Sequence, residues 1–218
     1  MKAVRLAVID YEAGNLHSAC KSLERAGAEA QLVTEPAGLE AFDGVVLPGD
    51  GAFDPAMQQL RARGFAEAIQ AAVERQQPFL GICLGLQVLF ERSEEGNEPG
   101  LGIVLGRVQR FRPEPGLRIP HMGWNQLHLT QPQSPLWAGI PDQTWVYFVH
   151  SYHAVPEDPS WVAATTQHGS QTCVAAIARG ALFATQFHPE KSGPVGLKIL
   201  QNFVDFVAGL PVDFSQAP

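Results

Sequence analysis

The amino-acid sequence predicts an α/β protein with a single domain, whose mostly parallel central sheet is flanked by helices and extended by antiparallel strands in the second half. Two observations support this fold class. In the first half of the 218 residues, short apolar runs alternate with segments of helical periodicity, an order typical of a parallel sheet with helices on both faces. In the second half, apolar runs follow one another and are separated by turns rich in proline and glycine.

Four apolar runs in the first half are predicted strands, namely residues 4–9, 30–33, 44–47 and 79–82. Three segments with helical spacing accompany them, at residues 16–26, 54–75 and 84–91. Gly27 is a typical residue just beyond the end of a helix, which places the end of the first one. Asp54 followed by Pro55 is a strong pair for the start of the second helix. This order predicts strands that pair in parallel.

Six further segments are predicted to be extended, at residues 102–110, 125–129, 145–149, 162–166, 172–177 and 181–186. The chain then returns to a helix, in which Pro194 suits the first position and apolar residues recur at helical spacing. Gly209 and the residues after it end this helix. Because no convincing linker or repeat divides the chain, we assign residues 1–211 to one domain and residues 212–218 to a C-terminal tail.

Composition narrows the class of protein. The formal net charge of −7 argues against nucleic acid and anionic membranes as binding partners. The three cysteines, Cys20, Cys83 and Cys173, have no close spacing, which favours a reducing compartment over a disulfide framework. The sequence contains no recognisable secretory signal and no apolar run long enough to span a membrane. We therefore expect a cytoplasmic protein.

Residues 78–87 carry the strongest functional signal. They read Pro-Phe-Leu-Gly-Ile-Cys-Leu-Gly-Leu-Gln, in which an apolar run ends at Cys83 and a helical pattern follows at once. Gly81 and Gly85 lie two residues to either side, where they permit a strained turn and close packing of strand against helix. This is the layout of a nucleophile elbow with sulfur in place of a serine hydroxyl. The turn places the thiol at a helix N-terminus, where the helix dipole favours the thiolate.

A thiol nucleophile needs a base and a group that orients the base. His188 and Glu190 are the best candidates, because His188 closes a predicted strand and Glu190 follows it across the stiff residue Pro189. The carboxyl ends of parallel strands meet at one edge of a sheet, and active sites of such folds gather there. The fold is therefore expected to bring His188 to Cys83 although they are far apart in the chain.

An acyl-transfer reaction also needs backbone donors for its oxyanion. We expect them at the N–H group of Leu84 and in the loop Gly49-Asp50-Gly51, which ends another predicted parallel strand. Each of these features alone is more often structural, since a buried cysteine is usually packing and Pro-Gly-Asp-Gly is usually a turn. Together, each at a strand end, they favour a cysteine enzyme that attacks a carboxamide or an ester.

The sequence predicts no cofactor and no metal. His150 and His153 are three residues apart, but they follow a strand, and no Asp, Glu or Cys completes a recognisable set of metal ligands. No glycine-rich dinucleotide fingerprint follows a strand, and no Walker A loop is present in the sequence. The tryptophans do not alternate with basic residues, so no face for nucleic acid is predicted.

The motif Gly81-Ile82-Cys83-Leu84-Gly85-Leu86-Gln87, with His188-Pro189-Glu190 far downstream, resembles the class I (triad) glutamine amidotransferases. The resemblance implies that Cys83, His188 and Glu190 form the catalytic triad. Members of that family hydrolyse glutamine to glutamate and pass ammonia to a synthase. Because the resemblance covers nearly the whole chain, it implies that the synthase is a separate partner protein.

Further segments are similar to the glutaminase subunits of imidazole glycerol phosphate synthases, namely residues 8–11, 14–16, 120–125, 147–152 and 186–192. This similarity implies a role in histidine biosynthesis. It also implies a heterodimer with a (β/α)₈-barrel cyclase subunit, which uses channelled ammonia to make imidazole glycerol phosphate and AICAR.

The same resemblance suggests roles for other residues. Residues expected to hold the α-amino and carboxylate groups of glutamine are Gln87, His150, Ser151 and Tyr152, the last three through their backbone. Residues expected to face the partner and the ammonia exit are Asn15, Met122, Trp124, Tyr147 and Lys191. The alternative is that Met122 and Trp124 belong to the core and that Lys191 is a solvated charge.

Three residues depart from the pattern of this subfamily. Asp50 stands where an apolar residue is frequent, Glu12 where glycine is frequent, and His153 where an aromatic residue is frequent. A carboxylate aimed inward would repel a developing oxyanion, so we expect Asp50 to point to solvent or to the partner. Alternative functions are the glutaminase of an anthranilate or aminodeoxychorismate synthase, a non-catalytic binding subunit on the same fold, and an independent cysteine hydrolase.

Overall fold

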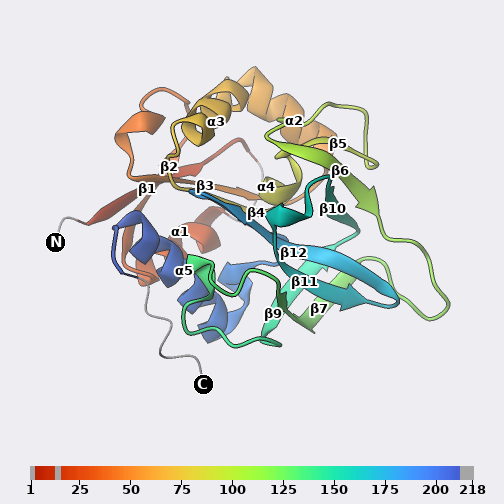
Figure 1. Ribbon diagram of the computed structural model, residues 1–218. Coiled ribbons are helices and arrows are strands. Elements are labelled where there is room, and N and C mark those ends of the chain that lie inside the picture. Colours follow the sequence, from red (N-terminus) through yellow and green to blue (C-terminus); the bar gives the residue numbers. More distant parts are fainter. Residues whose placement is uncertain (1–2, 13–15, 212–218) are drawn as a thin grey trace.

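The computed structural model describes residues 3–12 and 16–211 (Figure 1). Asn15 and the predicted tail at residues 212–218 therefore lie outside the described residues.

An eight-stranded sheet runs through the centre of the molecule in the order β2-β1-β3-β4-β13-β12-β11-β8. The first five strands of this order pair in parallel, and the remaining pairs are antiparallel. The strands are β1 Val4–Ile9, β2 Ala28–Val33, β3 Gly44–Gly49, β4 Phe79–Cys83, β8 His128–Leu129, β11 Val162–His168, β12 Gln171–Arg179 and β13 Leu182–Thr185. The predicted fold class, with a mostly parallel sheet and added antiparallel strands, is confirmed.

Helices cover both faces of this sheet (Figure 1). They are α1 Leu16–Arg25, α2 Phe53–Ala62, α3 Phe65–Glu74, α4 Leu84–Gln87 and α5 Gly193–Val207. Successive residues of a strand point to opposite faces, so Val8 packs in the core cluster with α1 and α5 while Ile9 packs in the cluster with α2 and α3. Burial of each such large apolar side chain contributes about 1.5–3 kcal/mol.

Two small sheets lie beside the central one. The first has the order β10-β6-β5, with β5 Phe90–Ser93, β6 Val104–Arg110 and β10 Tyr152–Pro156. The second pairs β7 His121–Gln126 with β9 Trp145–His150 in antiparallel fashion. Short 3₁₀ turns complete the chain at η1 Leu39–Ala41, η2 Pro135–Trp137, η3 Pro159–Trp161 and η4 Pro189–Lys191.

The prediction of one helix over residues 54–75 is wrong. Gly64 has a φ of 75° and lies between α2 and α3, where it breaks the helix into two. α2 also begins one residue before Asp54. The Asp54 carboxylate accepts the backbone N–H groups of Asn97 and Glu98, so it anchors a neighbouring loop instead of capping the helix.

The helix predicted over residues 84–91 is also wrong in extent. α4 has one turn, and the chain enters strand β5 at Phe90. All residues from Leu84 to Phe90 are buried, so this run carries no polar face from which periodicity could tell helix from strand.

Two strand predictions also differ from the structure. Strand β10 was missed, and the extended segment predicted at residues 125–129 is divided between β7 and β8.

All three cysteines are free, which agrees with the predicted lack of a disulfide framework. Among the described residues, no helix is long and apolar enough to cross a membrane.

Candidate active site

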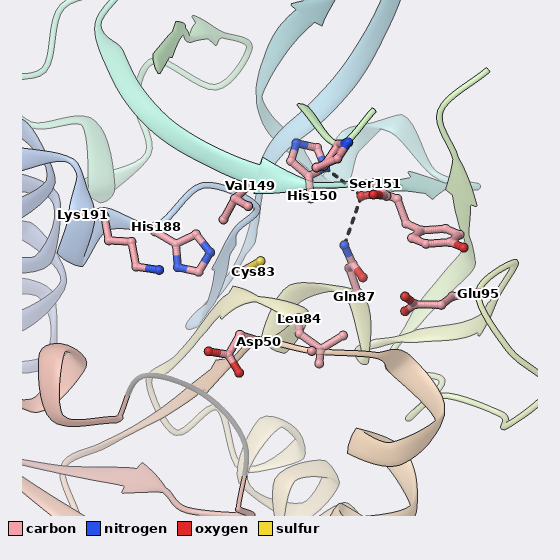
Figure 2. Close-up of a pocket in the computed structure, with 13 residues that line it drawn as sticks. Asp50, Cys83, Leu84, Gln87, Glu95, Val149, His150, Ser151, His188 and Lys191 are labelled. Carbon is pink, nitrogen blue, oxygen red and sulfur yellow. Dashed lines mark hydrogen bonds between the residues drawn. The ribbon is translucent and has the colours of Figure 1, made fainter. Parts of the chain in front are cut away.

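A pocket of about 300 Å³ lies at the carboxyl ends of the parallel strands β3 and β4. Its lining includes Cys83, His188 and Gln87, which come from β4, the loop after β13, and α4 (Figure 2). The topology thus brings together residues that are distant in the chain, because parallel neighbours end at the same edge of the sheet.

Cys83 is the last residue of β4 and adopts a φ of 55° and a ψ of −106°. A positive φ is rare for a residue other than glycine, and such strain concentrates at functional sites. The turn therefore strains the cysteine itself, whereas the two flanking glycines have no positive φ. α4 has a single turn, so the expected helix-dipole contribution is small.

The flanking glycines are required by close packing. A Cβ at Gly85 would lie 1.9 Å from the carbonyl oxygen of Leu47 on β3, and one at Gly81 would lie 2.6 Å from the carbonyl oxygen of Gly85. No side chain fits at either distance. The backbone of α4 thereby packs directly against the backbone of β3, next to the loop that follows that strand.

His188 and Glu190 form a buried pair. Nδ1 of His188 lies 2.7 Å from Oε1 of Glu190, and both side chains are 5% exposed. The intervening Pro189 begins the 3₁₀ turn η4, which holds the two side chains on the same side of the chain. The carboxylate accepts the Nδ1 proton, so Nε2 is the nitrogen available for chemistry.

The Cys83 sulfur lies between the His188 ring and Gln87 (Figure 2). Burial alone would lower the pKa of His188, but Cys83 and the Glu190 carboxylate favour the protonated ring and together raise this pKa to about 10. Nε2 makes no hydrogen bond at this geometry, so we attribute the Cys83 contribution to charge. A protonated ring next to the sulfur favours the thiolate, the nucleophilic form.

We expect Glu190→Gln to destabilise the protein most strongly at low pH. The raised pKa of His188 contributes stability that is complete below 6.5 and is lost as the pH rises through about 10. Without the carboxylate this contribution shrinks, so the difference in the free energy of unfolding between wild type and variant should narrow toward high pH. Chemical denaturation across this pH range measures it, with Glu67→Gln on the exposed face of α3 as the matched control. If the difference in the free energy of unfolding between wild type and Glu190→Gln did not vary with pH, the conclusion that Glu190 raises the pKa of His188 would be contradicted.

Of the expected oxyanion donors, Asp50, Gly51 and Leu84 line the pocket, and Gly49 pairs with Cys83 in the β3–β4 ladder. Asp50 is exposed at the rim, and its carboxylate points away from the Cys83 sulfur (Figure 2). This orientation agrees with the expectation that the carboxylate avoids the oxyanion position.

Tyr11 packs against Gly49 at the start of the loop at residues 49–51, a contact that the sequence analysis did not predict. Its side chain is fully buried, and a Cβ at Gly49 would lie 2.4 Å from the Tyr11 hydroxyl oxygen. That hydroxyl has no hydrogen-bond partner among the described residues. Burial, Asp50 and Cys83 all raise the pKa of Tyr11, so the hydroxyl stays neutral.

Gln87 is 5% exposed, and its amide nitrogen is held on two sides. It donates to the carbonyl oxygen of Tyr152 at 3.1 Å and to Oε1 of Gln186 at 3.0 Å. Gln186, which was not predicted as a site residue, in turn donates to the Cys83 sulfur at 3.6 Å. The carbonyl oxygen of Gln87 accepts no hydrogen bond from the described residues, so it is the group left for a ligand.

Glu95 is a second pocket residue that sequence reasoning missed. Its Oε2 accepts the backbone N–H of Phe53 at 2.8 Å, which fixes the carboxylate at the pocket wall (Figure 2). No local sequence signal identifies it, because it lies in the turn after β5, one of several acidic residues in that stretch.

The segment His150, Ser151 and Tyr152 lines the same pocket. The imidazole of His150 has both nitrogens occupied, one by the carbonyl oxygen of Tyr152 at 2.7 Å and one by His121 at 2.9 Å. The imidazole of His150 is therefore not available to a ligand.

Of the residues expected at the partner surface, Met122, Trp124 and Tyr147 lie on β7 and β9, and Lys191 lines the pocket next to His188, while Asn15 lies outside the described residues. Met122 and Trp124 are 65% and 52% exposed, so the alternative that they belong to the core is wrong. Trp124 pairs with Tyr147 across the two strands, with ring centroids 6.1 Å apart. Trp145, 53% exposed at the end of the same ladder, was not predicted.

Besides Asp50, the two other departures from the subfamily pattern have visible consequences. Glu12 adopts a φ of 67°, a left-handed conformation that favours glycine, and it forms an ion pair with Arg63. His153 is buried and stacks on Phe111 with ring centroids 4.9 Å apart, so it packs as an aromatic side chain would.

Among the described residues, no group of three or more His, Cys, Asp or Glu side chains is placed to hold a metal ion.

Comparison with known sequences extends these observations. The profile of the class I glutamine amidotransferase family matches residues 7–206. The imidazole glycerol phosphate synthase subunit HisH of Synechococcus sp. (strain JA-3-3Ab) is 90% identical over 208 residues, which cover 95% of this chain and 96% of that protein. The protein of the same name from Thermosynechococcus vestitus is 62% identical over 207 residues, covering 95% and 99%.

Solved structures share the fold at much lower identity. PurLQS from Thermotoga maritima matches with a TM-score of 0.76 and 22% identity, over 94% of this chain and 99% of that chain. The glutaminase domain of Trypanosoma brucei CTPS, with bound acivicin, matches with a TM-score of 0.70 and 18% identity, over 99% and 97% of the two chains.

Proposed function

This chain belongs to the class I glutamine amidotransferase family, and from that membership we propose that it is the glutaminase subunit of an imidazole glycerol phosphate synthase. It hydrolyses L-glutamine to glutamate and supplies ammonia to a cyclase subunit in histidine biosynthesis. The observation that carries this conclusion is the 90% identity, over nearly the full length of both chains, to a protein of that name. We assign residues 1–211 to the amidotransferase domain.

We propose that Cys83 is the nucleophile of an acyl-transfer reaction. Its thiolate attacks the side-chain carboxamide carbon of glutamine, and the tetrahedral oxyanion is held by backbone N–H groups of Leu84 and the loop at residues 49–51. Protonated His188 gives its Nε2 proton to the leaving nitrogen, the C–N bond breaks, and ammonia departs. The product is a thioester between Cys83 and the γ-glutamyl group.

Neutral His188 then accepts a proton from water, and the resulting hydroxide attacks the thioester. The C–S bond breaks, glutamate leaves, and both the thiolate and the protonated ring are restored. Glu190 keeps the proton on Nδ1 and stabilises the ring in its charged state, which it does from 2.7 Å.

Acceptors and donors on the pocket wall suit the two charged groups of an α-amino acid. The Glu95 carboxylate and the side-chain carbonyl oxygen of Gln87 are acceptors for the α-ammonium group, and both line the pocket. Backbone N–H groups of Ser151 and Tyr152 are the donors that we assign to the α-carboxylate. These assignments place the side-chain amide of glutamine toward Cys83.

We propose that the partner is a (β/α)₈-barrel cyclase that docks on the outer face of β7 and β9. This face exposes Met122, Trp124 and Trp145, a set of large apolar side chains typical of a protein interface. Val149 of the same ladder lines the active-site pocket, so ammonia released there needs to travel only a short way to the docked partner. The complex makes imidazole glycerol phosphate and AICAR. Asn15 stays a predicted interface residue.

We expect Trp124→Ala to raise the Kd for the cyclase by roughly 10- to 100-fold, because truncation of a central exposed aromatic residue removes an interface anchor. Titration of the cyclase, followed by calorimetry, measures the affinity. Leu105→Ala is the matched control, since Leu105 is 58% exposed but lies on β6 in a different sheet. Equal losses of affinity for the cyclase in Trp124→Ala and Leu105→Ala would show that the face of β7 and β9 is not the interface.

The proposed function is tested by glutamate formation in the presence of purified imidazole glycerol phosphate cyclase and its nucleotide ligand. We expect glutamine hydrolysis to be faster in the mixture than with the chain alone, and a heterodimer to elute from a sizing column. The synthase partner of an anthranilate-type enzyme serves as the negative control. Neither stimulation nor complex formation with the cyclase would reject the proposal.

A further inference from the structure

Two buried histidines face each other beneath the proposed partner surface. His121 on β7 and His150 on β9 are directly opposite in the antiparallel ladder, and they are 5% and 6% exposed. Nδ1 of His121 lies 2.9 Å from Nε2 of His150, a hydrogen-bond distance. The side chain of His121 belongs to the inner face of the strand, whereas that of Met122, the next residue, is exposed.

The neighbours of this pair determine where each proton lies. Nδ1 of His150 lies 2.7 Å from the carbonyl oxygen of Tyr152, which can only accept, so His150 carries its proton on Nδ1. Its Nε2 must then accept, so Nδ1 of His121 donates. Nε2 of His121 must accept in its turn, and Nδ2 of Asn125 is the donor at 3.1 Å.

The result is a chain of hydrogen bonds with a single direction, from Asn125 through His121 and His150 to Tyr152. Protonation of either ring would put two N–H groups face to face somewhere along it. Asn125 is itself fixed, because its Nδ2 also donates to the carbonyl oxygen of Gln167 at 2.6 Å and its Oδ1 accepts the backbone N–H of Gln126 at 2.8 Å. The chain therefore starts from a firmly held donor.

The surroundings keep both rings neutral. His121 stacks between Phe148 and His168, with ring centroids 4.7 Å and 4.3 Å away. Burial and the adjacent His168 lower the pKa of His121 to about 4. Burial likewise lowers the pKa of His150, against the opposing effect of its hydrogen bond to Tyr152, while His121, His153 and His168 lower it further.

The chain ends at the substrate pocket. The carbonyl oxygen of Tyr152 accepts from His150 and also from the amide nitrogen of Gln87, at 3.1 Å. That second bond fixes the orientation of the Gln87 amide, and hence which of its atoms faces a ligand. A donor that holds His150 in place therefore also holds Tyr152 and Gln87.

We propose that His121 is a positioning residue for glutamine, which acts through His150 on the Tyr152 carbonyl group and the Gln87 amide. The proposal rests on the assignment of this pocket to glutamine. His121 itself is absent from the pocket lining, so its effect is on the geometry of the binding residues.

Three substitutions separate the hydrogen bond that His121 donates to His150 from the space that its ring fills. The amide nitrogen of asparagine is as far along the side chain as Nδ1, so His121→Asn keeps a donor toward His150. The side-chain amide of a glutamine residue at position 121 reaches only the position of Nε2, so it has no donor at the position of Nδ1. A leucine residue at position 121 has no donor at all. We expect His121→Gln and His121→Leu to raise the KM for glutamine about tenfold, with kcat changed less than about threefold, and His121→Asn to stay near wild type in both.

The assay uses the complex with the cyclase, and circular dichroism verifies that each variant is folded. His128→Asn on the exposed surface of β8 is the matched control and should not change KM. If His121→Leu does not fold, the comparison of KM between His121→Asn and His121→Gln tests the proposal. Equal KM values for these two variants would overturn the proposal, because a purely structural role for the ring predicts equal losses.

A second readout compares two alkylating reagents on Cys83. A chloroketone analogue of glutamine must bind as an amino acid, whereas iodoacetamide needs only the sulfur. We expect His121→Gln to slow the first reaction about tenfold and to leave the second unchanged. Equal slowing of both would overturn the proposal. If wild type itself shows no preference for the glutamine analogue, the assignment of the pocket fails, and the role of His121 fails with it.

Discussion

Cys83→Ala is expected to abolish glutamine-dependent synthesis by the complex, with a fall in glutamine hydrolysis of about 10⁴-fold or more. The reason is that the sulfur forms the covalent bond in the proposed reaction and no other group in the pocket can replace it. Ammonia-dependent synthesis by the cyclase subunit should persist, because it needs no hydrolysis. Parallel assays with glutamine and with ammonium salt as the nitrogen source measure the two activities.

Cys20→Ala is the matched control for this substitution. Cys20 is a free, half-buried thiol on α1, outside the pocket lining, and its removal should leave both activities near wild type. Loss of ammonia-dependent synthesis in Cys83→Ala would contradict the division of labour between the two subunits. Retention of glutamine hydrolysis would remove Cys83 from the mechanism.

Gly85→Ala is expected to damage both stability and catalysis. The added Cβ would lie 1.9 Å from the carbonyl oxygen of Leu47, so the backbone of β3 or α4 must move. Overpacking against backbone of this kind costs about 3 kcal/mol. Alanine is favoured over glycine in a helix by about 1 kcal/mol, so any loss is steric in origin.

Catalysis should fall as well, because β3 leads directly into the loop that we assign to the oxyanion. A displacement of about 1 Å at such a position costs roughly 100-fold in rate. Denaturant unfolding and glutaminase assays of the complex measure the two effects. The matched control is Gly209→Ala, where a Cβ meets open space but φ is 67°, so only the conformational preference of glycine is lost. Equal unfolding energies for the two variants would show that the contact with Leu47 is unimportant.

Much of the fold could be predicted because it depends on local signals. The buried run Val4–Ile9 is a strand with the predicted bounds, and Gly27, whose φ is 96°, follows α1 as expected. The break at Gly64 could not be predicted, since glycine is tolerated inside helices and only packing decides whether it ends one. The short helix α4 could not be delimited, since every residue around it is buried.

Some residues of the candidate site could be identified from the sequence, and others could not. Cys83, His188 and Glu190 belong to short motifs whose chemistry can be read from residue type and spacing. Glu95 carries no such signal, and Gln186 lies in the recognised segment 186–192 without an assigned role, because the importance of both comes from what they face in three dimensions. His121 lies in a recognisable motif, yet its connection to Tyr152 passes through another strand and two imidazole rings.

The sequence by itself determined the fold class, because the order of apolar runs and helical segments along the chain indicates it. It also determined the cysteine turn and the histidine–carboxylate pair, because each of these is encoded within a few consecutive residues. Only the tertiary structure decided which side chains share the pocket and which nitrogen of each histidine carries a proton. The physical reason is that hydrogen-bond direction and burial depend on neighbours contributed by distant strands. The order of pairing in the sheet, which brings β3, β4 and β13 side by side, is what makes those neighbours meet.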